Sequence, residues 1–259
     1  MTNPAIRIAL QLQPQHADYA TLRDRVREAE DLGTDIVFNW DHFYPLYGDP
    51  DGKHYECWTM LGAWAEQTSR VEIGALVSCN SYRNPDLLAD MARTVDNISD
   101  GRLILGIGSG WFERDYTEYG FEFGTAGQRL DVLAESLPRI EARLGKLNPP
   151  PRRKLPILIG GGGERKTLRT VARHASIWHS FSDAETLTRK YAILKQHCSD
   201  IGRDPAEIEV SVGVGASGQP DEVAGPLLEA GATLLTVGVG NEGHDFGQLK
   251  SWLAWRDSL

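Results

Sequence analysis

The sequence has few residues in patterns that could form disulfide bonds or bind metals. Its three cysteines, Cys57, Cys79 and Cys198, are odd in number and widely spaced, which fits neither a disulfide framework nor a metal site. The histidines form no His-x-His or His-Glu-x-x-His pattern, so we expect no bound metal. A chain of 259 residues can bury about 75% of its unfolded surface without disulfide bonds or bound metals.

Long apolar runs and excess basic charge are also missing. No apolar segment approaches the ~20 residues that span a bilayer. The first residues show no basic stretch followed by an apolar run, so we expect a cytoplasmic protein without a signal peptide. The net charge of −9 argues against nucleic acid or an anionic membrane as the main partner. We expect a small-molecule substrate instead.

Short apolar stretches alternate with longer segments of helical period. The predicted strands are 6–12, 35–39, 71–77, 103–107, 156–160, 176–179, 208–212 and 233–237, and the predicted helices are 17–32, 57–68, 87–98, 126–144, 164–174, 183–199, 221–229 and 246–255. Eight strand–helix repeats indicate a parallel sheet, and this length suits one (β/α)8 TIM barrel. We predict a single barrel domain over residues 1–259, with a doubly wound sheet as the alternative. Pro138 predicts a kink or a late break in its helix.

Glycines and an aromatic residue follow the fourth predicted strand, at the end where a barrel carries its active site. Gly106, Gly108 and Gly110 permit close approach of the backbone to a ligand, and we expect Trp111 beside them to face a pocket. Trp111 stands where the third glycine of Gly-x-Gly-x-x-Gly belongs. Ile104 stands where methyltransferases that use S-adenosylmethionine usually carry an acidic residue. Neither nucleotide interpretation is favoured.

Four glycines, 160–163, follow the fifth predicted strand and precede a helix. Free backbone N–H groups at a helix start suit a phosphate, so we predict a phosphate site at Gly161, Gly162 and Gly163. Arg165 and Lys166 in the expected first turn oppose the helix dipole unless an anion compensates them. The alternative is a flexible strand–helix turn. No Gly-Lys-Ser/Thr closes the run, so it is no Walker loop.

Asp41 and His42 follow the second predicted strand as a neighbouring carboxylate and imidazole. An imidazole can move a proton near neutral pH, so both are candidate catalytic residues. The alternative is a loop-capping aspartate beside a surface histidine.

Several segments together resemble the luciferase-like monooxygenase superfamily, and most of all its branch that uses the deazaflavin coenzyme F420. They are 58–61, 69–74, 82–85, 101–111 and 156–163. The resemblance implies a (β/α)8 barrel with the deazaflavin at its C-terminal mouth, and a homodimer. It also implies a non-prolyl cis peptide bond between Leu76 and Val77, which would lie behind the ring.

The resemblance further assigns roles to particular residues. Asp41, His42 and Phe43 match an Asp-His-Phe motif whose histidine serves in proton transfer or stabilises an intermediate. Gly161 and Gly162 would hold the cofactor's phosphate tail, with Gly108 and Gly110 alongside. Relatives usually carry an insertion between residues 144 and 156 that helps to cover the pocket. This chain is short there, so we expect a more open site or one covered partly by a partner chain.

The leading hypothesis is therefore an F420-dependent oxidoreductase that transfers hydride between the deazaflavin C5 and a small organic substrate. The first alternative keeps the barrel but uses reduced FMN and oxygen, as two-component monooxygenases do. The second is a non-catalytic protein that binds a flavin or deazaflavin. A methyltransferase is a more distant alternative.

Overall fold

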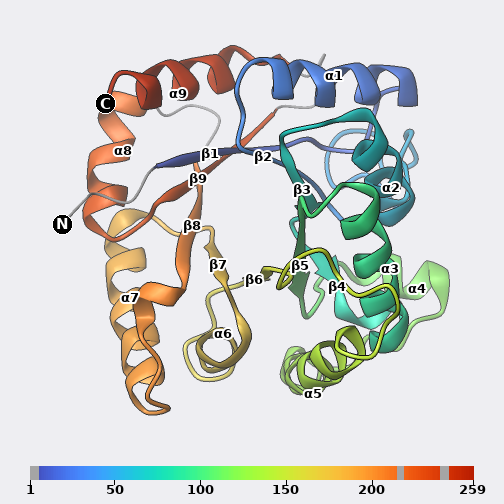
Figure 1. Ribbon diagram of the computed structural model, residues 1–259, viewed down its shortest axis with the longest axis vertical. Coiled ribbons are helices and arrows are strands. Elements are labelled where there is room, and N and C mark those ends of the chain that lie inside the picture. The colour runs from blue at the N-terminus through green and yellow to red at the C-terminus, as the bar shows by residue number, and fades with distance from the viewer. Residues whose placement is uncertain (1–5, 215–218, 240–244) are drawn as a thin grey trace.

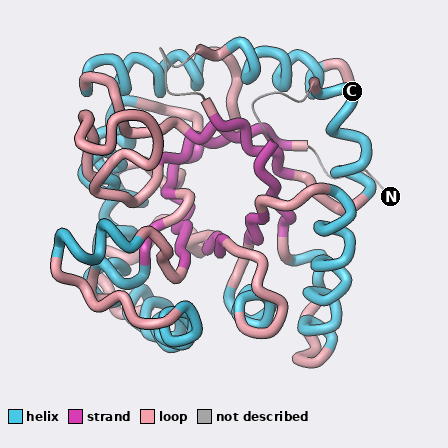
Figure 2. The backbone as a smooth tube through the Cα atoms, turned by 180° about the vertical axis from the view of Figure 1, so that it is seen from behind, coloured by secondary structure: helices cyan, strands magenta, loops and turns pink. Residues whose placement is uncertain are grey.

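The strands form a closed barrel inside a ring of helices (Figures 1 and 2). The computed structural model describes residues 6–214, 219–239 and 245–259, so the amino end considered above lies outside the described residues. The strands are β1 Arg7–Gln11, β2 Ile36–Asn39, β3 Glu72–Ala75, β4 Ser78–Cys79, β5 Leu103–Gly108, β6 Ile157–Gly160, β7 Ile177–Ser180, β8 Glu209–Val214 and β9 Leu234–Gly238. They are parallel in the order β3-β2-β1-β9-β8-β7-β6-β5-β4, and a β3–β5 pairing closes the ring. The predicted (β/α)8 barrel is confirmed, and the doubly wound sheet is wrong.

The third barrel strand is interrupted. Ile73 and Gly74 of β3 pair with the start of β5, and β4 pairs with its end, so β3 and β4 are two parts of one strand. Between them the peptide bond from Leu76 to Val77 is cis, as the sequence resemblance implied.

Glycine lets the chains meet at this interruption. A Cβ on Gly106 of β5 would lie 1.8 Å from the carbonyl oxygen of Ala75. No side chain fits there, so Gly106 is needed for β3 and β5 to approach and close the barrel. This glycine serves the fold rather than a ligand.

Apolar side chains fill the middle of the barrel, and charged side chains lie at the amino ends of its strands. Ala9, Phe38, Ile104, Leu158 and Leu234 belong to a buried cluster that fills the interior. At the amino ends of the strands the Arg7 guanidinium binds both Glu72 (2.6 Å) and Glu209 (2.5 Å). Among the described residues the barrel is thus filled in its middle and at the amino ends of its strands, as in other TIM barrels.

The helices pack on the outside of the barrel and bury a second, larger apolar cluster. They are α1 Tyr19–Asp31, α2 Cys57–Gln67, α3 Pro85–Ile98, α4 Glu113–Tyr119, α5 Ala126–Leu144, α6 Thr167–His174, α7 Ala184–Ser199, α8 Pro220–Glu229 and α9 Gly247–Asp257. Within the described residues none is long and apolar enough to cross a bilayer. The sequence did not predict α4 or the two-residue strand β4, because both are too short to show a periodicity.

The helix ends follow from local chemistry. The Asn84 side chain accepts a hydrogen bond from the Asp86 N–H with Pro85 at the first position, a strong start signal for α3. α5 runs unbroken through Pro138, so the predicted break is wrong. Leu137 and Ile140 are buried on either side of that proline, and their packing holds the helix together there.

The connection 145–156 does not lie near the mouth of the barrel. It joins the end of α5 to the start of β6, at the amino ends of the strands. The Asn97 amide binds the Pro150 carbonyl oxygen (3.0 Å), and the Arg152 N–H binds Asp96 (2.7 Å), which fixes it to the end of α3. The expectation that its shortness opens the pocket is therefore wrong for a topological reason.

Candidate active site

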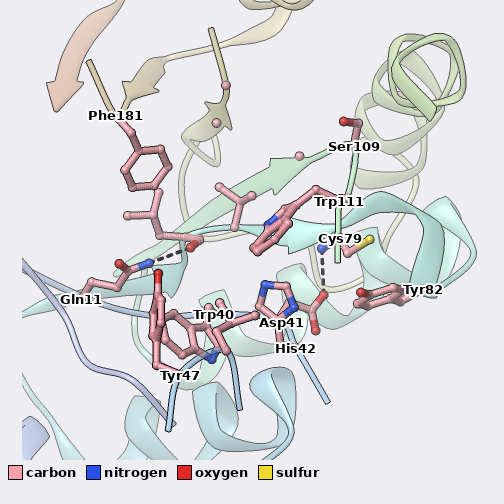
Figure 3. A pocket seen from close by; sticks show the side chains of 17 residues that line it. Gln11, Trp40, Asp41, His42, Tyr47, Cys79, Tyr82, Ser109, Trp111 and Phe181 are labelled. Atoms are coloured by element: carbon pink, nitrogen blue, oxygen red, sulfur yellow. Dashed lines mark hydrogen bonds between the residues drawn. The ribbon is translucent and has the colours of Figure 1, made fainter. Parts of the chain in front are cut away.

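A cavity of about 480 Å³ lies at the carboxyl ends of the strands (Figure 3). Its size is within the range of small-molecule sites. Eight of the ten residues predicted for the site line it, namely Asp41, His42, Leu76, Val77, Gly108, Gly110, Trp111 and Gly161. The structure therefore brings most of the predicted residues together around one cavity, although Asp41 and His42 do not pair with each other.

The carboxylate partner of His42 is Asp115. His42 Nδ1 lies 2.7 Å from Asp115 Oδ2, and the Asp115 side chain is fully buried. The same carboxylate accepts hydrogen bonds from the Tyr82 hydroxyl (3.0 Å) and the Phe43 N–H (3.2 Å). Burial raises the pKa of Tyr82, which keeps its hydroxyl protonated as a donor. His42 Nε2 has no hydrogen-bond partner within the described residues and remains free for a ligand.

Asp41 has a different task from the one the sequence suggested. Its carboxylate binds Arg83 through both oxygens (2.5 and 3.0 Å) and accepts from the Cys79 N–H (2.9 Å). Burial acts to lower the pKa of Arg83, but the hydrogen bonds and charge of Asp41 raise it on balance. Asp41 is bound to Arg83 and Cys79 while His42 is bound to Asp115, so Asp41 and His42 do not form the expected pair. Asp41 anchors the loop that carries His42.

Aromatic rings surround His42. Trp111 packs edge-on to the imidazole at 5.8 Å between ring centroids, and Trp40 does so at 6.1 Å. Trp111 faces the cavity as predicted and is 63% exposed. The Trp40 indole N–H donates to His54 Nε2 (3.1 Å). Burial lowers the pKa of His54 to about 4, so this histidine stays neutral and keeps accepting that bond.

The floor of the cavity is made by the interrupted strand and its glycine neighbours. The Leu76 carbonyl oxygen accepts from the Gln11 amide (2.9 Å), which fixes the cis segment to β1. Val77 occupies the space that a side chain on Gly108 or Gly160 would need, since a Cβ there would lie 2.7 and 3.0 Å from its methyl carbons. This part of the lining is therefore apolar, the kind of surface against which a planar ring can pack.

The four glycines are divided between two tasks. Gly161 lines the cavity with φ +127°, but its N–H is bonded to the His179 carbonyl oxygen (3.0 Å) and is not free. Gly162 and Gly163 lie outside the cavity lining. The Lys190 ammonium lies over Gly162, 2.4 Å from where a Cβ would be. Lys190 has no anionic partner within the described residues.

Arg165 and Lys166 do not lie in the first turn of a helix, contrary to the prediction. α6 begins at Thr167, so Arg165 and Lys166 precede the helix instead of standing in its first turn. The Lys166 ammonium is already neutralised by Asp131 (2.7 Å to both oxygens). Within the described residues neither Arg165 nor Lys190 has an ion-pair partner within 4 Å, and the Lys190 ammonium is the one that lies over Gly162.

Sequence reasoning missed other residues of the site. Asp115 lies on α4, the helix that was not predicted. A charged residue between the aromatic residues Phe112 and Tyr116 is the signal that could have marked it. Gln11 and Phe181 also line the cavity from β1 and the end of β7. Within the described residues no group of three metal-ligating side chains comes together.

The closed parallel barrel with an apolar floor, a buried carboxylate–imidazole pair and a ligand-sized cavity at its carboxyl end defines an enzyme-like TIM barrel. The family model described as luciferase-like monooxygenase matches residues 4–224. The chain belongs to the luciferase-like monooxygenase family.

Known proteins support the same assignment. An F420-dependent glucose-6-phosphate dehydrogenase of Microbacterium testaceum is 30% identical over 213 residues, which are 74% of this chain and 62% of that protein. Among solved structures, an F420-dependent secondary alcohol dehydrogenase with an F420-acetone adduct superposes with a TM-score of 0.83 at 16% identity, over 96% of this chain and 98% of that one. The oxygenating constituent of 3,6-diketocamphane monooxygenase from Pseudomonas putida, with FMN, gives 0.66 at 17% identity, over 84% and 69%. Both of these solved structures share the fold of this chain.

Proposed function

We propose that the protein is an F420-dependent oxidoreductase acting on a small organic substrate. The single observation that carries the proposal is His42, held by Asp115 in a cavity that Leu76 and Val77 also line. The relative named as F420-dependent supports this choice of cofactor over FMN.

The residues present fit a deazaflavin. Leu76 and Val77, with Gly108 beside them, offer the flat apolar floor that its ring needs. The Lys190 ammonium near Gly162 would bind the anionic tail, and Gly161, whose N–H is already bonded, would leave space for it without a side chain. When bound, the deazaflavin supplies a carbon, C5, that accepts or donates a hydride.

His42 moves the proton that accompanies the hydride. Because the Asp115 carboxylate can only accept, His42 Nδ1 carries the hydrogen of that bond, and Nε2 of the neutral ring is left as a base toward the cavity. Nε2 would take the proton of a substrate hydroxyl during oxidation and return it during reduction. The aromatic rings around it limit access of water.

Fluorescence titration with F420 and with FMN tests the cofactor choice. We expect micromolar binding of F420 and much weaker binding of FMN. Micromolar binding of FMN alone would overturn the choice and favour the two-component monooxygenase. Oxygen uptake with reduced FMN would then be the activity to measure.

The alternative of a non-catalytic binding protein makes a different prediction for the same site. It requires that His42→Ala retain cofactor binding and that the wild-type protein show no turnover to lose. Turnover by the wild-type protein with F420 and an alcohol excludes it.

We also propose a homodimer that uses the surface between α2 and α3. Leu87 (54% exposed), Ile98 (41% exposed) and Met91 form an apolar face there, next to Gly62, which has open space around it. The molar mass from light scattering tests this proposal, with Leu87→Asp expected to give monomers. A cytoplasmic location remains a prediction.

A further inference from the structure

We propose that the cavity takes an uncharged, largely apolar alcohol of about aromatic size, or the matching ketone, and rejects phosphorylated substrates. This inference rests on the proposed function and adds the substrate class. In the oxidising direction His42 Nε2 would take the O–H proton of the alcohol and the C=O bond would form, while the carbinol C–H hydrogen would leave as hydride, for which a bound deazaflavin would be the acceptor. The substrate loses two electrons and the cofactor gains them.

Within the described residues the lining carries no lysine or arginine that could neutralise a phosphate. Within the described residues its charged side chains are Asp41, and His42 when protonated, without any lysine or arginine. The segments 215–218 and 240–244, which the structure does not describe, contain neither residue type in the sequence. A phosphate dianion placed beside His42 would therefore be desolvated without a counter-charge, which is strongly unfavourable.

The arginines nearest the cavity are already engaged. Arg83 forms its two-pronged ion pair with the buried Asp41. Arg114 binds Asp51 (2.5 Å) and lies 3.9 Å over the Tyr44 ring. Arg129 donates to the carbonyl oxygens of Gly110 (3.1 Å) and Phe123 (2.9 Å). To release any of them for a substrate would break contacts within the protein.

The buried carboxylate of Asp115 also disfavours a phosphorylated substrate. The contacts of Asp115 within the described residues are His42, the Tyr82 hydroxyl and the Phe43 N–H, without an arginine or lysine. A carboxylate that is paired with one imidazole leaves a negative field at this end of the cavity. An anionic substrate would be repelled, whereas a neutral alcohol is not.

The remaining wall is aromatic and exposed. Tyr47, Trp111 and Phe181 are 57%, 63% and 74% exposed, and all three line this one cavity (Figure 3). Large apolar side chains that gather around one cavity while exposed to water mark a binding surface for an apolar ligand. With His42 as the convergent proton-transfer group, such a wall fits a molecule with one reacting oxygen and an apolar body.

The test uses the full protein loaded with F420 and compares acetophenone with glucose 6-phosphate by calorimetry. We expect acetophenone to bind at least 100-fold more tightly. We also expect 1-phenylethanol, but not glucose 6-phosphate, to reduce the bound F420. Equal or tighter binding of glucose 6-phosphate would overturn the substrate class. Failure of F420 itself to bind, measured before substrate is added, would overturn the proposed function instead.

Two variants and one control distinguish the effect of charge on substrate binding from the effect of apolar contact. Trp111→Ala should weaken acetophenone binding at least tenfold, and an unchanged affinity would contradict the role of the aromatic wall. Tyr47→Lys places a cation in the lining and should raise the affinity for glucose 6-phosphate at least tenfold. No gain there would contradict the charge argument. Val132→Ala, on an exposed position of α5 away from the cavity, should change neither affinity.

Discussion

The imidazole of His42 and the carboxylate of Asp115 lie 2.7 Å apart, although 73 positions separate them in the chain. The pair joins the loop after β2 to the helix after β5, across the mouth of the barrel. It fixes both the orientation and the tautomer of His42, the imidazole that lines the cavity within the described part of the chain. The predictions below test this arrangement and the structure that supports it.

Replacing Asp115 should affect the chemical step more than binding. In Asp115→Asn the amide no longer stabilises the protonated imidazole, so we expect kcat for 1-phenylethanol oxidation to fall about tenfold or more. KM should change little, and the pH profile of kcat should differ from that of the wild type. Tyr82→Phe removes one hydrogen bond from Asp115 but leaves the pair with His42, so it serves as the control with a smaller effect. Identical pH profiles for wild type and Asp115→Asn would show that Asp115 is merely structural.

Replacing His42 should separate catalysis from cofactor binding. His42→Ala removes the proton acceptor, and we expect kcat to fall about 10²- to 10⁴-fold. The floor at Leu76 and Val77 is untouched, so F420 affinity, measured by fluorescence titration, should be retained. Full activity of His42→Ala would rule out its assigned role.

The ion pair between Asp41 and Arg83 should be important for stability. The side chains are 0% and 9% exposed, so either partner alone would be left as a buried, unpaired charge. We expect Arg83→Met to lower the free energy of unfolding by about 3–5 kcal/mol in urea titrations. The double variant Asp41→Asn with Arg83→Met should cost less than the sum of the two single variants, and strict additivity would refute the coupling.

Two buried histidines should make the protein sensitive to mild acid. Burial lowers the pKa of His179 to about 3 and that of His54 to about 4, against 6.5 for an unperturbed histidine. Below pH 6.5 the unfolded chain takes up protons that the native state refuses, so stability is complete above that pH and falls toward pH 4. His179→Gln should flatten this decline, which urea unfolding at several pH values can measure. A wild-type stability that does not change between pH 6.5 and 4 would exclude this account.

Lys190 should contribute to binding of an anionic tail. Its ammonium lies over Gly162, and we expect Lys190→Gln to weaken F420 binding about tenfold at low salt, with a smaller difference at high salt. Lys195→Gln on the same helix is the matched control, because that ammonium lies 4.2 Å from the Tyr191 ring centroid. Equal effects of the two substitutions would show that only the overall charge matters.

The periodicity of the sequence was sufficient to predict the barrel, because alternating strands and helices leave a regular pattern. The mouth could be located for the same reason, since residues such as His42 and Trp111 directly follow strands. The pairings across the mouth could not be predicted. Asp115 reaches His42 only because barrel closure brings β2 and β5 near each other, and neighbouring positions in the chain wrongly suggested Asp41.

The sequence also could not predict which lysine lies over the four glycines. Lys166 stands beside the four glycines in sequence but is bound by Asp131, whereas Lys190 comes from the next helix and lies over Gly162. The prediction that the short connection 145–156 opens the pocket failed for a similar reason. A connection that leaves a strand lies at the carboxyl end of the barrel. One that enters a strand, as 145–156 does, lies at the amino end.

A crystal structure with oxidised F420 tests the central claim most directly. The account predicts the deazaflavin ring against Leu76 and Val77, with His42 Nε2 facing the substrate side and the anionic tail near Gly161 and Lys190. Density for the ring elsewhere, or a cavity that F420 leaves empty at saturating concentration, would contradict it.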